Sequence, residues 1–102
     1  MENDENVDLP ALRHAFELPE ENNFSEFRLA LHNIVLHWLQ SDLEKLRRIL
    51  YRIDVSEALA RKAFELEDSV AIAERLTDLL IDRELQKLRN RGTSSQGDWM
   101  DL

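Results

Sequence analysis

The chain has 102 residues, of which 33% are charged and 43% hydrophobic, and its formal net charge is −8. This length fits one domain, and the scarcity of helix breakers, with two Gly and two Pro, favours helices throughout. The absence of Cys excludes disulfides, thiolate nucleophiles and Cys-based zinc sites. The apolar runs are far shorter than the roughly 20 residues of a membrane span, and the acidic start MENDENVD does not resemble a secretory signal. We therefore expect a cytoplasmic protein that does not enter a membrane.

The negative charge is concentrated at the two ends of the chain. Residues 1–23 contain seven acidic residues and one basic residue, Arg13, and residues 93–102 contain two acidic residues and no basic one. When these are subtracted from the totals of 21 acidic and 13 basic residues, twelve of each remain over residues 24–92. The overall acidity therefore does not exclude an anionic partner for the central part of the chain.

A short helix is expected at residues 10–18, within an acidic amino-terminal arm that spans residues 1–23. Pro10 suits the first turn of a helix, and Pro19 would end it. The apolar side of this helix would consist of Leu9, Leu12 and Phe16.

The first long helix is expected over residues 24–40. Asn23 and Glu26 have the spacing of a capping box, in which each side chain accepts a hydrogen bond from the other residue's backbone amide. Apolar residues then recur every three or four positions, which is typical of a helix with a buried face. They are Phe24, Phe27, Leu31, Ile34, Val35 and Trp38.

A shorter helix should follow over residues 42–53, with Ser41 as its amino-terminal cap and Glu44 completing a second capping box. Only Gln40 and Ser41 lie between its first residue and Leu39, the last apolar residue of the first helix. The sequence leaves open whether the two are separate or form one kinked rod, although a cap at Ser41 favours a break. One face is apolar and consists of Leu43, Leu46, Ile49, Leu50 and Ile53.

Two further helices are expected, over residues 55–66 and 69–91. Asp54 is expected to cap the shorter of them, and Asp68 or Ser69 is expected to cap the longer. Gly92 would end the last helix, because glycine is common just after a helix carboxyl terminus.

These elements predict an all-α fold with a four-helix bundle-like core at residues 24–92, made of two long and two short helices. The acidic arm with its short helix would precede this core, and a flexible acidic and aromatic tail at residues 93–102 would follow it. Two short helices cannot cover two long ones completely, so some apolar surface should remain. The arm, the tail or a second copy of the chain would cover it, and we expect a homodimer.

No pattern in the sequence points to catalysis. His32 and His37 lie about 140° apart around a helix, so they cannot bind one metal ion as histidines one turn apart would. Glu74, Asp78 and Asp82 lie on the polar side of the last helix, where a solvated charged face is expected. We therefore expect no enzyme activity, no catalytic residues, no metal site and no cofactor.

The helix at residues 42–53 carries a basic cluster outside its apolar face. We expect an interaction surface there, formed by Lys45, Arg48, Tyr51 and Arg52. A second candidate lies in the tail, where Trp99 and Met100 stand between two acidic residues. These two side chains would either dock to a partner or pack against the core.

An alternative interpretation is a nucleic-acid-associated regulator. The two short helices have the spacing of a helix-turn-helix, and the basic cluster could contact phosphates. The second short helix would have to read the bases, but it carries Glu57 and Glu65, whose charges oppose phosphate. In this alternative the acidic ends of the chain would restrain the basic helix.

The stretches ILYRIDVSEAL and AERLTDLLIDRELQKLRNR resemble a small family of all-helical bacterial proteins of unknown function. In that family, a Leu-Tyr-Arg-Ile-Asp-Val-Ser-Glu corner precedes a final helix with a Leu-Gln-Lys stretch. The resemblance covers residues 24–91 and implies a compact helical fold and a bacterial cytosolic source. It carries over no catalytic residue.

The sequence as a whole predicts a cytosolic protein–protein interaction or assembly module without catalysis. The module would act through an apolar groove or dimer face that is edged by the basic cluster. Its protein partner is not identified by any feature of the sequence.

Overall fold

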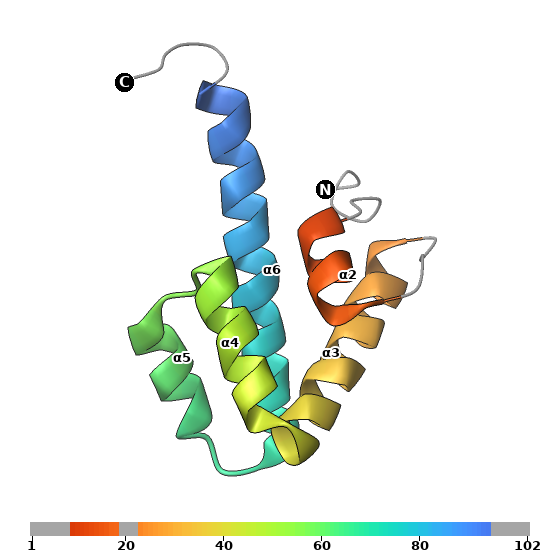
Figure 1. Ribbon diagram of the computed structural model, residues 1–102, viewed down its shortest axis with the longest axis vertical. Coiled ribbons are helices and arrows are strands. Elements are labelled where there is room, and N and C mark those ends of the chain that lie inside the picture. The colour runs from red at the N-terminus through yellow and green to blue at the C-terminus, as the bar shows by residue number, and fades with distance from the viewer. Residues whose placement is uncertain (1–8, 19–22, 95–102) are drawn as a thin grey trace.

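The computed structural model describes residues 9–18 and 23–94, which contain five α-helices and no β-strand. The all-α, bundle-like fold predicted from the sequence is confirmed (Figure 1). The helices are α2 (Pro10–Phe16), α3 (Phe24–Ser41), α4 (Leu43–Ile53), α5 (Glu57–Phe64) and α6 (Ser69–Ser94).

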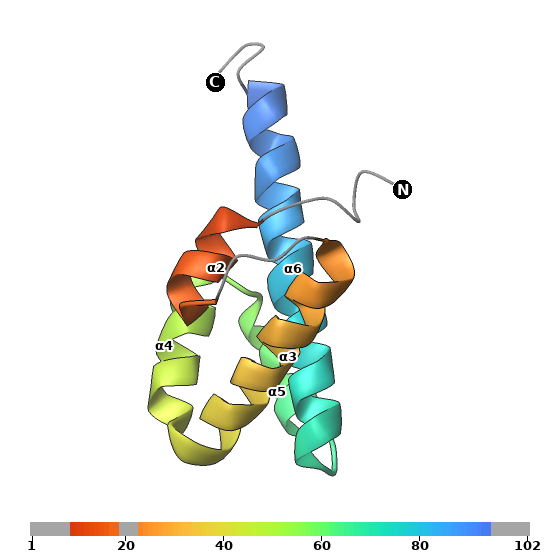
Figure 2. The ribbon, with the colours of Figure 1, turned by 90° about the vertical axis from the view of Figure 1, so that its right-hand side faces the viewer.

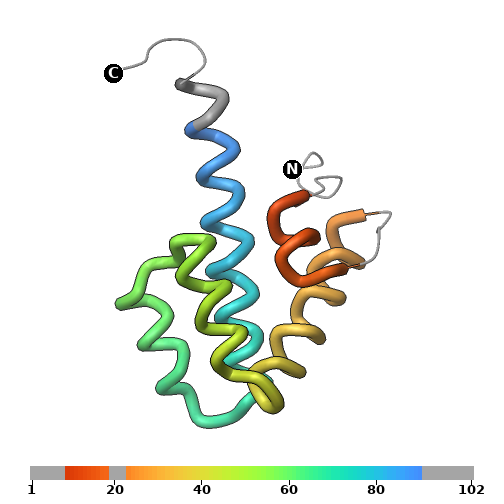
Figure 3. Tube along the Cα trace, viewed as in Figure 1, coloured from red at the N-terminus to blue at the C-terminus, as the bar shows by residue number. Residues whose placement is uncertain are grey.

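The long helix α6 is the central element of the fold. Each of the other four helices contacts it, and α3 does so over the greatest length. The chain reverses direction between α3 and α4, so that α4 returns along α6, while α5 packs on another side of α6 (Figures 1 and 3). The last turns of α6 extend beyond the other helices, as two views at right angles show (Figures 1 and 2). One side of α4 faces α2, and another faces α5.

The short helix α2 belongs to the hydrophobic core, although it was predicted in an arm outside the core domain. Leu9, Leu12 and Phe16 are buried, and the Phe16 ring stacks on Trp38 of α3 with ring centroids 4.9 Å apart. Burying one Leu or Phe side chain stabilises the folded state by about 1.5–3 kcal/mol. The packing of α2 on the core is therefore favoured over its exposure to solvent. α2 therefore covers part of the apolar surface that the two short helices, α4 and α5, do not cover.

The predicted apolar face of α3 is confirmed. Phe27, Leu31, Val35 and Trp38 are buried in the core, and Phe24 and Ile34 pack against its edge. The predicted cap is confirmed as well, because the Asn23 side chain accepts a hydrogen bond of 2.9 Å from the backbone amide of Glu26.

Two separate helices, α3 and α4, occupy the region that the sequence left open, but the predicted cap at Ser41 is wrong. Ser41 is the last residue of α3, and its hydroxyl donates to the backbone oxygen of His37. Asp42 instead caps α4, accepting a hydrogen bond of 3.2 Å from the amide of Lys45. The hydroxyl of a helical serine finds an acceptor in the preceding turn, which leaves the capping role to the next residue.

The corner between α4 and α5 also differs from the prediction, because Asp54 ends α4 rather than capping α5. Asp54 adopts a left-handed conformation with φ 71°, and the amide of Val55 donates to the oxygen of Leu50 in a Schellman motif. Ser56 caps α5, accepting from the amide of Leu59. α5 consequently starts two residues later than expected, at Glu57.

The last helix begins as predicted and ends later than predicted. Asp68 caps it, accepting a hydrogen bond of 2.8 Å from the amide of Ala71. Its helical backbone continues through Gly92 to Ser94, so two residues of the predicted tail are helical. Glycine costs a helix about 1 kcal/mol relative to alanine but ends it only where it turns left-handed, and none of the glycines described has a positive φ. No described helix is long and apolar enough to cross a membrane.

Candidate functional site

A groove of about 880 Å³ lies between α2 and α4. Its walls combine basic side chains with a few apolar ones, and we call it the basic groove. The lining residues are Pro10, Arg13, His14, Ala15, Glu17 and Leu18 from the α2 side, and Lys45, Arg48, Ile49 and Arg52 from α4.

The α4 wall brings together three of the four residues predicted on this helix. Lys45, Arg48 and Arg52 follow one another at intervals of three and four residues, so their side chains leave the same face of the helix. The adjoining face fixes this orientation, because it is anchored in the core by the buried side chains of Leu46, Ile49, Leu50 and Ile53.

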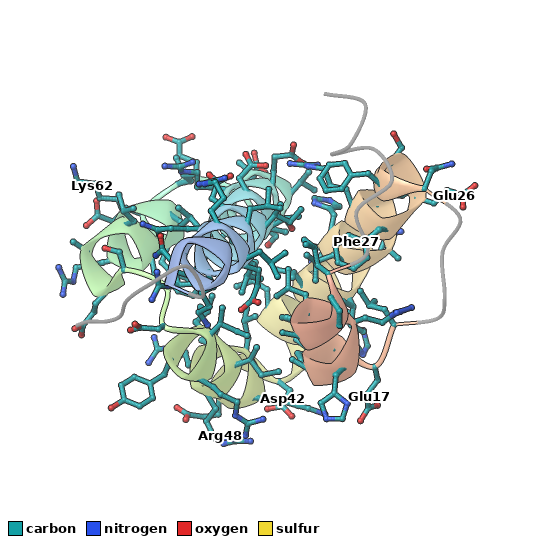
Figure 4. All side chains as sticks on the ribbon, turned by 90° about the horizontal axis from the view of Figure 1, so that it is seen from above. Glu17, Glu26, Phe27, Asp42, Arg48 and Lys62 are labelled. Carbon is teal, nitrogen blue, oxygen red and sulfur yellow. The ribbon has the colours of Figure 1, made fainter. Side chains whose placement is uncertain are left out.

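The second wall comes from α2, which was not predicted to lie beside α4. α2 ends at Phe16, and the next residue, Glu17, is its left-handed cap with φ 56°. The amide of Leu18 donates a hydrogen bond of 2.9 Å to the oxygen of Arg13. This turn places Glu17 and Leu18 at the groove. Seen from above, the side chains of Glu17 and Arg48 lie on the same side of the molecule (Figure 4).

The charge of the basic groove is positive. Arg13, Lys45, Arg48 and Arg52 line it, and Glu17 is the one carboxylate among the described lining residues. The exposed side chains of Arg48 and Arg52 have no hydrogen-bond or ion-pair partner within the described part of the chain. Guanidinium groups bind carboxylates and phosphates through paired, charge-assisted hydrogen bonds, so these two residues can bind an anionic group that enters the groove.

Lys45 occupies a more fixed position than the two arginines. Its ammonium nitrogen lies 4.4 Å from the centre of the Trp38 ring, a cation–π contact. Because Trp38 in turn stacks on Phe16, this contact connects the basic groove to the packing of α2 on α3.

A second groove, of about 570 Å³, lies on the other side of α4, toward α5. Its walls include the apolar residues Leu50, Val55, Ala60 and Phe64, and we call it the apolar groove. The predicted residue Tyr51 lines this groove, with 88% of its surface exposed, rather than the basic groove. The surface predicted from Lys45, Arg48, Tyr51 and Arg52 is therefore divided between the two sides of α4. Trp99 and Met100, the other two predicted interaction residues, lie outside the described residues.

A cluster of charged residues joins α3 to α6 away from both grooves. Arg28 donates a hydrogen bond of 3.0 Å to Glu74 and a second one to Asp78. The hydrogen bond with Asp78 and the one with Glu74 raise the pKa of Arg28, against the opposing effect of burial. Glu74 and Asp78 therefore do more than form the solvated face that the sequence predicted. The missed partner, Arg28, lies 46 and 50 positions away in the sequence, beyond the reach of local spacing rules.

His32 adjoins the same cluster, with its Nδ1 3.5 Å from a carboxylate oxygen of Glu74. This nitrogen is buried and has no hydrogen-bond partner in the part of the chain described. His37 is exposed on α3, and His14 lines the basic groove. No group of three or more His, Asp or Glu side chains within the described residues is arranged to hold a metal ion.

None of three comparisons, with protein-family models, with curated proteins and with solved structures, finds a match for this chain.

Proposed function

We propose that the protein is a non-catalytic interaction module that binds an acidic segment of a protein partner in the basic groove. The observation that carries this proposal is the convergence of Arg13, Lys45, Arg48 and Arg52 on one groove, where a single described carboxylate opposes them. Cations gathered at such a density attract anionic partners and speed their association.

The lining of the groove supports a peptide as the occupant. Ala15, Leu18 and Ile49 provide apolar surface between the cationic groups. A peptide that alternates acidic and apolar side chains would match both kinds of surface. Contacts to apolar groups contribute affinity, and the charges contribute orientation and rate.

A nucleic-acid partner is less well supported by the geometry. The helix that would read bases, α5, carries Arg61, whose guanidinium lies 3.9 Å from the carboxylate of Glu57 in the same helix. Glu65 and Glu67 are exposed just beyond its end. These carboxylates would repel the phosphates of a bound duplex.

The broader expectations from the sequence belong to the same proposal. They are a cytoplasmic location, membership of the small bacterial all-helical family, and a homodimeric assembly. Tyr51 and the apolar groove are the described surface that best suits contact with a second copy, because exposed aromatic side chains are enriched in interfaces.

The proposal is tested with a short fluorescein-labelled peptide rich in Asp, Glu and Leu, titrated with the full chain at low salt. Arg48→Glu combined with Arg52→Glu should weaken binding by at least about tenfold, since two attractive charges become repulsive. Binding should also weaken as salt is raised, because the screening length falls.

Lys62→Glu, compared with Arg48→Glu alone, provides the matched control. Lys62 is exposed on α5, away from the basic groove (Figure 4), so the same kind of charge reversal there should leave peptide affinity within about twofold. If both variants lost the same amount of peptide affinity, net charge alone would explain the binding, and a localised site would be contradicted. Tighter binding of a DNA oligonucleotide than of the peptide would support the nucleic-acid alternative instead.

A further inference from the structure

The basic groove begins where a strongly acidic part of the same chain enters the fold. Residues 1–8, Met-Glu-Asn-Asp-Glu-Asn-Val-Asp, contain four acidic residues and no Lys or Arg. They lie outside the described residues, but their point of attachment is fixed. Leu9 is buried in the core, with 1% of its surface exposed, and the next residue, Pro10, lines the basic groove.

The length of this segment is sufficient for it to span the groove. Lys45 and Arg52 are seven residues apart on α4, which corresponds to ~10 Å along the helix. Eight extended residues span up to ~26 Å. Pro10 and Arg52 line the same groove, so a segment attached beside Pro10 starts at the edge of the cationic wall.

Charge and tethering both favour occupancy by this segment. Glu2, Asp4, Glu5 and Asp8 are opposite in sign to Lys45, Arg48 and Arg52, which form the α4 wall of the groove. A segment attached at the edge of a site has an effective concentration on the order of millimolar. Even weak individual contacts to Arg48 and Arg52 therefore compete well with a partner that is present at micromolar concentration.

We infer that residues 1–8 bind in the basic groove and act as an internal competitor, which an acidic partner must displace. This inference rests on the proposed function for its biological meaning, since it specifies how access to that site is regulated. The contact between residues 1–8 and the α4 wall can be measured without any partner.

The direct measurement is carbodiimide cross-linking of the full chain, which joins carboxylates to lysine amines that they touch. The monomeric product is digested with trypsin and analysed by mass spectrometry. Lys45 should be linked to the tryptic peptide of residues 1–13 in at least about tenfold excess over Lys62, although Lys62 is the more exposed of the two, because Lys62 lies away from the groove. Linkage of Lys45 to residues 97–102 instead, or equal linkage of both lysines to residues 1–13, would overturn the inference.

A functional measurement uses the full-length variant with Glu2→Gln, Asp4→Asn, Glu5→Gln and Asp8→Asn, which keeps the chain length and removes the charges. If the segment fills the groove about nine-tenths of the time, the variant should bind the labelled acidic peptide about tenfold more tightly than the unmodified chain. Asp98→Asn with Asp101→Asn removes acidic charge at the other end of the chain and should leave this affinity unchanged.

The outcomes separate this inference from the proposed function. Equal peptide affinity for the unmodified chain and the variant would overturn the internal competitor and leave the acidic-peptide site intact. Failure of both proteins to bind the peptide would contradict the proposed function, and the linkage of Lys45 would then still decide whether residues 1–8 occupy the groove.

Discussion

Arg83 of α6 donates a hydrogen bond of 3.0 Å to the carboxylate of Asp54, the left-handed residue that closes α4. The bond connects the corner between α4 and α5 to the central helix. It also gives a reason for aspartate at this position, where glycine would adopt the left-handed conformation at lower energetic cost. Asp tolerates the left-handed conformation better than most residues, and it adds an ion pair that glycine cannot provide.

Substitutions at Asp54 should separate these two contributions. Asp54→Gly loses the pair with Arg83 but removes the cost of the left-handed conformation, so its free energy of unfolding should stay within about 0.5 kcal/mol of the unmodified protein. Asp54→Ala loses the pair and keeps the strained backbone, so it should be destabilised by about 1–2 kcal/mol. Urea unfolding followed by circular dichroism measures both. An alanine variant as stable as the glycine variant would show that the backbone conformation carries no cost.

The cluster of Arg28 with Glu74 and Asp78 should contribute modestly to stability. Arg28→Gln should lower the free energy of unfolding by about 1 kcal/mol, because all three side chains are partly solvated and exposed ion pairs contribute little. In a double-mutant cycle with Asp78→Asn, the coupling energy should be about 0.5–1 kcal/mol and should fall as salt is added.

Arg75→Gln is the matched control for this cluster. Arg75 is exposed on α6, next to Glu74 in sequence, and has no hydrogen-bond or ion-pair partner among the residues described. Its substitution should change stability by less than about 0.5 kcal/mol. If Arg28→Gln costs no more than Arg75→Gln, the contacts between α3 and α6 do not stabilise the fold.

The packing of α2 predicts that the region preceding α3 unfolds together with the bundle. Leu12 has no exposed surface, so Leu12→Ala should destabilise the whole protein by about 2–5 kcal/mol in a single transition. Leu29→Ala makes the same change at an exposed position of α3 and should cost less than about 0.5 kcal/mol. An unchanged unfolding midpoint for Leu12→Ala would mean that α2 is an independent arm, as the sequence suggested.

Local patterns in the sequence predicted the helices well and their ends less well. The apolar spacing of Phe27, Leu31, Val35 and Trp38 reports a periodicity within one helix, which needs no knowledge of the fold. The ends depend on neighbours. Both Ser41 and Asp42 can cap a helix, as can Asp54 and Ser56, and which of them does so is decided by where the preceding helix stops.

Only half of the candidate site could be predicted from the sequence. The basic cluster on α4 is visible because Lys45, Arg48 and Arg52 are close in the chain. Arg13 and His14, which face them across the groove, are about thirty residues earlier, and their position depends on the burial of the apolar side of α2. For a related reason, the sequence did not show that Tyr51 lies in a different groove from the other three predicted residues of α4. A helix wheel shows which side chains are exposed, but not which neighbouring helix lies next to each of them.

The apolar groove leads to a last prediction, on oligomeric state. Tyr51 is 88% exposed beside Leu50, Ala60 and Phe64, and a second copy that packs there would bury an aromatic side chain of the kind that dominates interface energetics. Light scattering at tens of micromolar should therefore give twice the monomer mass of 12.0 kDa. Tyr51→Asp should shift the equilibrium to the monomer by at least about tenfold, while Lys62→Asp, on the exposed face of α5, should not. A monomeric mass for the unmodified chain would exclude the homodimer, and a dimer that persists in Tyr51→Asp would place its interface elsewhere than the apolar groove.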